Sequence, residues 1–230
     1  MINFYSVGVG SGEGGYITIG AIRTIEKSDI IAVPVKKYGE KSTALEILKK
    51  EYDISKKEIM EVEFLMSPDI KLREQSRKKS AEKIIDALKN GKTVSMITLG
   101  DVSVYSTCSY IHNAVKKNGF KMEIIPGITS FCAAANKIQT SLCEGNESFA
   151  VIPSVNITLI EKYITDFDTL IIMKAGLNID KLYDVLLKHG LENNAIVTSS
   201  LGLSDEVIEK IDKDKEYGYF TTVIIKRKGF

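Results

Sequence analysis

The chain has 230 residues, 44% of them hydrophobic and 27% charged, which is the composition of a globular protein with ample material for a core. Its 31 basic and 30 acidic residues leave a net charge of +1, which gives no field that would favour nucleic acid or a membrane surface. Because the first residues lack signal-peptide features and no apolar stretch reaches the length of a membrane span, we expect a cytoplasmic protein.

Strands and helices alternate along the first half of the chain. Short apolar segments predict strands at 4–9, 30–34, 59–64, 93–97 and 121–125. Amphipathic or well-capped segments between them predict helices at 18–27, 43–50, 69–90 and 109–118. This alternation is typical of a mainly parallel sheet covered by helices.

The regular alternation of strands and helices ends after Pro126-Gly127. Helices are predicted at 130–138 and 179–189, and the strand candidates are 149–152, 169–173, 195–199 and 221–226. Their more open spacing suggests a mixed sheet. We therefore expect an α/β protein of two domains, an N-terminal one at 1–118 and a C-terminal one at 119–230, with the boundary between residues 115 and 122.

Two loops follow predicted strands and are candidates for ligand binding. The segment 98–107 reads TLGDVSVYST, and the segment 124–130 reads IIPGITS. In open α/β sheets, ligands bind at the carboxyl ends of the strands. Gly100 would let the backbone approach a ligand closely, and Asp101 would offer a fixed negative charge or acceptor. Asp101 as an ordinary turn residue is the alternative.

The glycine-rich loop at 8–15 does not fit a dinucleotide site. Counted from Gly8, the pattern G-x-G-x-x-G fails because position 13 is Glu13. The segment 30–34 also ends without an acidic residue that could hold a ribose. An NAD-dependent oxidoreductase is therefore a weak alternative, which nicotinamide binding would reveal.

The chain resembles the tetrapyrrole methylases almost from end to end. The resemblance is carried by the first glycine loop, by Ile17-Thr18, by the segment 28–34, by Gly100-Asp101-Val102 and by the segment 126–130. Within that family, the segments 64–69, 101–107, 126–135 and 144–153 are similar to the branch that methylates carbon 20 of precorrin-2 or cobalt-factor II in cobalamin biosynthesis. The chain departs from the family at Gly10-Ser11-Gly12-Glu13-Gly14, where Gly-Pro-Gly-Asp-Pro is usual, and at Val102, where proline is usual.

The resemblance implies an enzyme that transfers a methyl group from S-adenosyl-L-methionine bound in a cleft between the domains. It implies a homodimer, and it implies that the cofactor-binding residues are Leu99, Gly100, Asp101, Val104, Thr129, Ser130 and Met173. Ser11 would lie beside the cofactor. Two simpler interpretations stay open, because Thr129-Ser130 could cap a helix and Met173 could belong to the core. No catalytic base can be singled out.

A tetrapyrrole that carries carboxylates should meet basic side chains. Lys36, Lys37, Arg73 and Arg77 are candidates, although each could be an ordinary surface charge. Tyr105 and Tyr110 could pack against the macrocycle or belong to the core.

Metal binding by the protein itself is not expected. The three cysteines (Cys108, Cys132 and Cys143) have no metal-ligand spacing, and neither His112 nor His189 has a cysteine or carboxylate at ligand spacing. Cobalt would therefore be carried by the substrate. Two other functions remain open: methylation of a cobalamin precursor at carbon 11 or 17, and a non-catalytic protein that binds S-adenosylmethionine.

Overall fold

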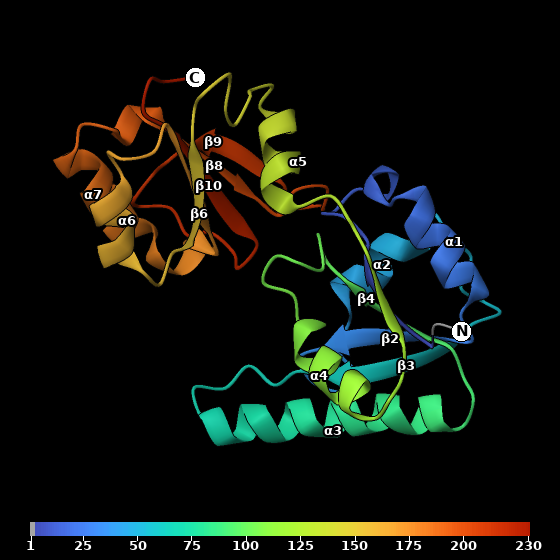
Figure 1. The fold of residues 1–230 in the computed structure, drawn as a ribbon. Coiled ribbons are helices and arrows are strands. Elements are labelled where there is room, and N and C mark those ends of the chain that lie inside the picture. The colour runs from blue at the N-terminus through green and yellow to red at the C-terminus, as the bar shows by residue number, and fades with distance from the viewer. Residues whose placement is uncertain (1–2) are drawn as a thin grey trace. The chain divides into compact units, whose positions relative to one another are not determined.

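The structure, a computed structural model, describes residues 3–230, and it divides after Thr129 into two compact units. Each unit is built on its own five-stranded sheet (Figure 1). The units are described separately below as unit 1 and unit 2.

Unit 1 contains a parallel sheet in the order β3-β2-β4-β1-β5. Its strands are β1 (Phe4–Gly8), β2 (Ile30–Val35), β3 (Glu58–Glu63), β4 (Val94–Thr98) and β5 (Met122–Ile125). The central strand β1 pairs with β4 from Phe4↔Val94 to Gly8↔Thr98 and with β5 on its other side. Both β1 and β4 are buried along their whole length, as expected for strands covered on both faces.

Helices cover both faces of this sheet. On one face, α1 (Ile19–Lys27) and α2 (Thr43–Lys49) share a core with Tyr5 and Val7 of β1. On the other, α3 (Ile70–Lys89) and α4 (Ser109–Lys117) share a core with Phe4 and the neighbouring strands. Successive side chains of a strand point to opposite faces, so both cores draw on β1. A 3-10 turn, η1 (Gly14–Tyr16), precedes α1.

The neighbouring strands β1 and β4 continue in opposite directions across the sheet. From β1 the chain passes through α1 to β2, whereas from β4 it passes through α4 to β5 on the far side of β1. Such a reversal of strand order leaves a crevice at the carboxyl ends of the two strands, where open α/β sheets bind ligands.

Unit 2 contains a mixed sheet in the order β6-β7-β10-β8-β9. Its strands are β6 (Phe149–Pro153), β7 (Thr169–Met173), β8 (Ala195–Ser199), β9 (Val207–Lys210) and β10 (Thr221–Lys226), and only the β6–β7 pair is parallel. The helices α6 (Ile157–Tyr163) and α7 (Ile179–Lys188) share the main apolar core of this sheet, and α5 (Ser130–Lys137) packs against β10. Two 3-10 turns, η2 (Ala175–Asn178) and η3 (Glu192–Asn194), flank α7.

The fold class predicted from the sequence is confirmed: an N-terminal parallel sheet is followed by a mixed one. Two short elements, α6 and β9, were not predicted. The division of the chain also differs from the expected ranges 1–118 and 119–230. Residues 122–125 pair with β1, so this strand belongs to unit 1 and the division follows Thr129. Among residues 3–230, no helix is long and apolar enough to cross a membrane.

Candidate functional site

Three loops of unit 1 meet at the carboxyl ends of β1, β4 and β5. Gly10 and Gly100 form an isolated antiparallel bridge, in which each backbone N–H donates to the other residue's carbonyl at 3.2 and 2.7 Å. The N–H of Val9 also donates to the carbonyl of Thr98 at 3.0 Å. Both bridge glycines have positive φ angles, 74° and 70°, which side chains rarely allow. The first glycine loop is therefore fixed to the loop that carries Asp101.

The third loop is held by close contact of glycine backbones. A Cβ atom on Gly127 would overlap the carbonyl oxygen of Gly100 and lie 2.8 Å from the carbonyl carbon of Gly8. A Cβ atom on Gly8 would lie 2.7 Å from both the Gly100 oxygen and the Gly127 nitrogen. Only glycine fits at these two positions, so the sequence leaves bare backbone where the three loops meet.

Asp101 joins two of these loops by its carboxylate. The side chain is 9% exposed, and its Oδ2 accepts a hydrogen bond from the Gly127 N–H at 2.8 Å. Oδ1 accepts from the Ser103 N–H at 2.8 Å and from the Ser103 hydroxyl. Burial by itself raises the pKa of this carboxyl, but the hydrogen bonds from Ser103, Gly127 and Val102 outweigh it and hold the pKa below its ordinary value of 3.8. Asp101 is therefore ionised at neutral pH and already engaged within unit 1.

Two buried hydroxyls in the same loops lack hydrogen-bond partners. They are the Oγ of Ser11, in the first loop, and the Oγ1 of Thr129, at the end of the third loop. Buried polar groups are usually paired, so both are free to bind a polar ligand. The unpaired hydroxyl of Thr129 also excludes the interpretation that its side chain caps α5. These two groups and the bare glycine backbone are compatible with a polar cofactor at this crevice.

The other predicted cofactor residues lie in both units. Leu99 is half-buried and packs against the core shared by α1 and α2, and Val104 is half-buried in the turn after Asp101. Val102 is only 3% exposed and belongs to the core shared by α3 and α4. An apolar side chain at this position is therefore required for packing.

Ser130 and Met173 belong to unit 2. Ser130 is the first residue of α5 and is half-buried. Met173 ends β7 and is also half-buried, outside the main core of that unit. The next residue, Lys174, has a positive φ of 57°, and its carbonyl accepts a hydrogen bond from the Ser154 hydroxyl at 2.6 Å. The chain after Met173 is therefore held in a defined turn at the end of β7.

The Nε2 atom of each histidine lies in a buried or partly buried position. Nε2 of His112 lies 2.8 Å from the hydroxyl of the fully buried Ser6, and burial, with a smaller contribution from Lys116, lowers its pKa below 6.5. Nε2 of His189 is buried without a partner. Among residues 3–230, no group of three His, Cys, Asp or Glu side chains is arranged to hold a metal ion.

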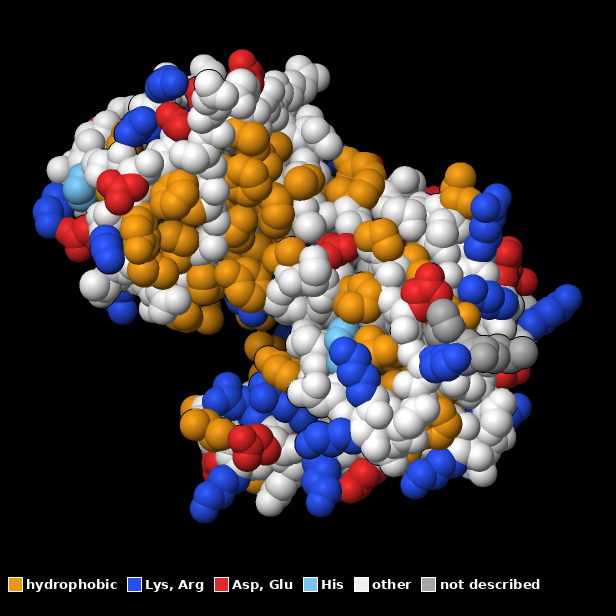
Figure 2. All heavy atoms as spheres, in the orientation of Figure 1, with side chains coloured by type: hydrophobic (Ala, Val, Ile, Leu, Met, Phe, Trp, Pro, Cys, Tyr) orange, Lys and Arg blue, Asp and Glu red, His pale blue; other side chains and the backbone are white. Residues whose placement is uncertain are grey.

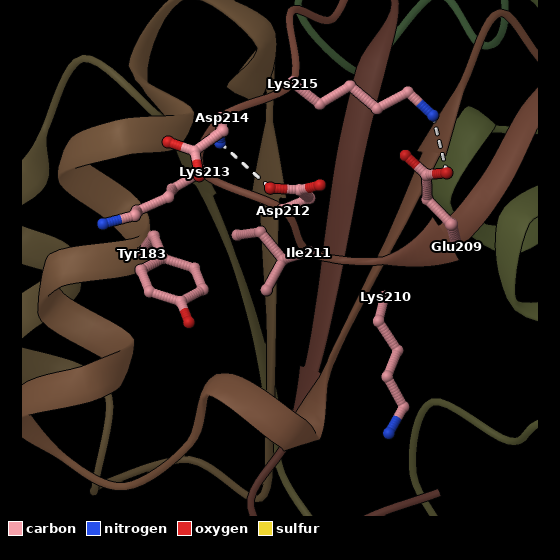
Figure 3. A pocket seen from close by; sticks show the side chains of 8 residues that line it. All are labelled: Tyr183, Glu209, Lys210, Ile211, Asp212, Lys213, Asp214 and Lys215. Carbon is pink, nitrogen blue, oxygen red and sulfur yellow. Dashed lines mark hydrogen bonds and ion pairs between the residues drawn. The ribbon is translucent and has the colours of Figure 1, made fainter.

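Unit 2 contains an open pocket between α7 and the chain that follows β9. Figure 3 shows its lining, which runs from Tyr183 on α7 to Lys215. Glu209 is paired there with Lys215 at 2.6 Å and accepts a hydrogen bond from the Tyr217 hydroxyl at 2.6 Å. None of the predicted site residues lines this pocket, and the Glu209 carboxylate is satisfied by neighbouring side chains.

Sequence reasoning did not identify the glycine contacts or the internal role of Asp101. The signal for the first was present, since Gly8 lies near the end of the first predicted strand and Gly10, Gly100 and Gly127 follow predicted strands. The signal for the second was not, because the donor from Gly127 is a backbone group, and its proximity depends on which strands are neighbours.

Comparison with known proteins places these features in one family. The sequence model described as Tetrapyrrole (Corrin/Porphyrin) Methylases matches residues 3–213. The chain is 35% identical over 97% of its length to the probable cobalt-precorrin-2 C(20)-methyltransferase of Methanocaldococcus jannaschii, of which the match covers 95%. It is 28% identical over 97% of its length to the cobalt-precorrin-2 C(20)-methyltransferase of Salmonella typhimurium, of which the match covers 96%.

Solved structures share the fold. A uroporphyrin-III-C-methyltransferase from Thermus thermophilus superimposes with a TM-score of 0.73 at 17% identity, covering 98% of this chain and 94% of that one. A structure of that enzyme type from the same organism, complexed with S-adenyl homocysteine, gives a TM-score of 0.72 at 15% identity, covering 98% and 97% of the two chains.

Proposed function

Because the chain belongs to the tetrapyrrole (corrin/porphyrin) methylases, we propose that it is an S-adenosylmethionine-dependent methyltransferase that acts on carbon 20 of precorrin-2 or its cobalt form. The observation that carries the proposal is the 35% identity, over nearly the full length of both chains, to a relative named for this reaction. The two relatives named for cobalt-precorrin-2 are 35% and 28% identical, and one named for metal-free precorrin-2 is 24% identical. This gradient favours the cobalt form.

The crevice of unit 1 supports the cofactor assignment. Leu99, Gly100 and Val104 would present backbone and small apolar surface to S-adenosylmethionine, and the hydroxyl of Thr129 would donate to it or accept from it. Ser130 and Met173, which belong to unit 2, are the other two residues that the resemblance implies for cofactor binding. Asp101 would contribute its negative charge, and its hydrogen bond from the Gly127 N–H would fix the third loop.

The main task of the protein in this reaction would be to position the methyl donor and the substrate. S-adenosylmethionine supplies a methyl group already activated on a sulfonium, and carbon 20 of the substrate is an electron-rich position. The residues of this chain would hold the two reactants in line and exclude water, and the three fixed glycine loops are suited to that task because they are rigid. We assign no side chain as the base that receives the proton lost from carbon 20. The enzyme would act as a cytoplasmic homodimer.

A second candidate is methylation at another position of the same pathway. The chain is 30% identical over 64% of its length to the cobalt-precorrin-4 C(11)-methyltransferase of Methanocaldococcus jannaschii. The shorter match makes this the less favoured reaction.

The test is incubation of the purified protein with precorrin-2, with and without cobalt, and with S-adenosylmethionine carrying a labelled methyl group. We expect the product to gain one methyl by mass and to carry the label at carbon 20 by NMR. Label at carbon 11 or 17 would overturn the assigned position. Binding of S-adenosylhomocysteine without any transfer would instead show a non-catalytic binding protein, and absence of binding would overturn both.

A further inference from the structure

Arg77 of α3 is held flat against an aromatic ring. Its guanidinium carbon lies 3.6 Å from the centre of the Tyr110 ring, which in turn lies 6.4 Å from the ring of Phe64. Tyr110 is 46% exposed, while Phe64 is buried below it. A guanidinium stacked on a ring has a fixed plane and keeps its N–H groups directed outward along its edges.

Arg73 lies one helical turn before Arg77, on the same face of α3. Its Nε is buried and has no hydrogen-bond partner. Among the residues that the structure describes, neither arginine forms an ion pair. Leaving a buried guanidinium N–H without an acceptor costs free energy, unless a bound ligand supplies that acceptor.

Three carboxylates at the end of β3 and at the start of α3 accept hydrogen bonds from backbone donors, and Glu74 lies between the two arginines on α3. The carboxylate of Glu61 accepts from the Gly39 N–H at 2.8 Å, and that of Glu63 accepts from the Tyr38 N–H at 3.3 Å. Asp69 caps α3 by accepting from the Lys71 N–H at 2.8 Å. These three carboxylates hold the loops after β2 and β3 by accepting from backbone donors, and none of them is ion-paired with Arg73 or Arg77.

Exposed apolar side chains lie in the segment before α3 and in its first turn. Leu65 is 36% exposed, Met66 59% and Leu72 45%. Figure 2 shows Lys and Arg side chains beside apolar ones over the beginning of α3. Apolar surface next to unpaired guanidinium groups suits a flat, largely apolar ring system with carboxylates at its edge.

We propose that Arg73, Arg77 and Tyr110 form a subsite of unit 1 that binds the peripheral carboxylates of the tetrapyrrole and so orients the macrocycle. This rests on the proposed function, since it names how that substrate is recognised. Arginine suits the task better than lysine because its planar fork binds a carboxylate through two parallel hydrogen bonds. Tyr110 holds the fork of Arg77 in place before the substrate arrives.

The test uses the whole protein and two probes measured separately. Uroporphyrin III, which carries free acetate and propionate groups, is titrated by fluorescence, and S-adenosylhomocysteine is titrated by calorimetry. We expect Arg77→Gln and Arg73→Gln each to weaken uroporphyrin III binding about tenfold or more, the loss of one charge-assisted contact, with unchanged affinity for S-adenosylhomocysteine. Arg77→Lys should recover only part of the loss, because charge is restored without the fork.

Lys79→Gln is the matched control. Lys79 is exposed on the opposite side of α3, so this substitution removes one positive charge away from the proposed subsite. It should bind uroporphyrin III like the unmodified protein. The octamethyl ester of uroporphyrin III should bind the unmodified protein and Arg77→Gln equally weakly. Equal affinity of Arg73→Gln, Arg77→Gln and Lys79→Gln for uroporphyrin III would overturn the subsite, even if methyl transfer to precorrin-2 is observed. Selective loss in the arginine variants would support the subsite, even if the proposed carbon 20 reaction fails.

Discussion

The Oδ2 atom of Asp101 lies 2.8 Å from the backbone nitrogen of Gly127, so one carboxylate joins the loop after β4 to the loop after β5. These two strands are not neighbours in the sheet, because β1 lies between them. The contact passes over the end of β1, where Gly8 leaves room for it. The resemblance to the tetrapyrrole methylases implies that Asp101 touches the cofactor, and the structure adds that its oxygens already accept hydrogen bonds from Gly127 and Ser103.

Asp101→Asn should therefore reduce both stability and cofactor affinity. An amide has one acceptor oxygen, so its NH2 group would face either the Gly127 N–H or the donors of Ser103. We expect a loss of about 1–3 kcal/mol in the free energy of unfolding, the cost of one unsatisfied buried donor, measured by urea titration. Ser103→Ala removes only a hydroxyl donor, so it should lower the free energy of unfolding by less. Unchanged stability with lost S-adenosylhomocysteine binding would show that Asp101 acts on the ligand alone.

Gly127→Ala should disrupt the crevice. The new methyl group would overlap the carbonyl oxygen of Gly100 and press on Gly8, so the three loops could not keep their present positions. We expect a destabilisation of about 1–3 kcal/mol, as for overpacking, together with loss of S-adenosylhomocysteine binding by calorimetry. Gly20→Ala is the matched control, because an added Cβ there lies 3.8 Å from its nearest neighbours. Equal behaviour of both variants would contradict the close contact.

Thr129→Val separates ligand binding from stability. The Thr129 hydroxyl is buried and unpaired, so its replacement by a methyl group of similar size should leave the free energy of unfolding within about 0.5 kcal/mol. If this hydroxyl serves the cofactor, affinity for S-adenosylhomocysteine should fall about two- to tenfold, the value of one hydrogen bond. Thr98→Val is the contrasting variant, because the Thr98 hydroxyl accepts from Ser106 at 3.0 Å. It should lose stability. A Thr129→Val variant that binds normally would remove Thr129 from the site.

His112 should make stability depend on pH. Burial lowers its pKa in the folded protein below the ordinary value of 6.5, so the unfolded chain binds the proton more readily. This contribution to stability is complete above pH 6.5 and decreases as the pH falls below that value. Urea titrations between about pH 7.5 and 5 should show this decrease. It should be smaller in His112→Gln, whose amide can still reach Ser6; an identical decrease in both proteins would exclude His112 as the cause.

The three cysteines should differ in reactivity. Cys108 is fully buried, and burial raises its pKa to about 11, whereas Cys132 and Cys143 are exposed. The thiolate is the reactive form, so a thiol reagent at pH 8 should label Cys132 and Cys143 rapidly and Cys108 only after denaturation. Peptide mass mapping identifies the labelled sites. Rapid labelling of Cys108 in the folded protein would show that unit 1 opens around α4.

Much of the fold was predictable because its signals are local. The apolar segments at 30–34 and 93–97 indicate buried strands by themselves, and the long amphipathic helix predicted at 69–90 is observed as α3. The short strand β9 was missed because its pattern is half exposed and spans only Val207–Lys210. The segment 122–125 was correctly predicted as a strand, but its assignment to the second domain was wrong, since strand pairing is not encoded in the strand's own residues.

The family, the two-sheet α/β class and the glycine-rich loops follow from residue type and spacing along the chain, so they could be recognised without a structure. The tertiary structure alone decided that Gly8, Gly100 and Gly127 touch, that Asp101 is bound to Gly127, and that Arg77 rests on Tyr110. The physical reason is that each of these contacts joins segments far apart in sequence. The glycine and Asp101 contacts form only when β1, inserted between β4 and β5, fixes the positions of the loops after these strands, and the Arg77–Tyr110 contact forms only when α3 and α4 pack on the same face of the sheet.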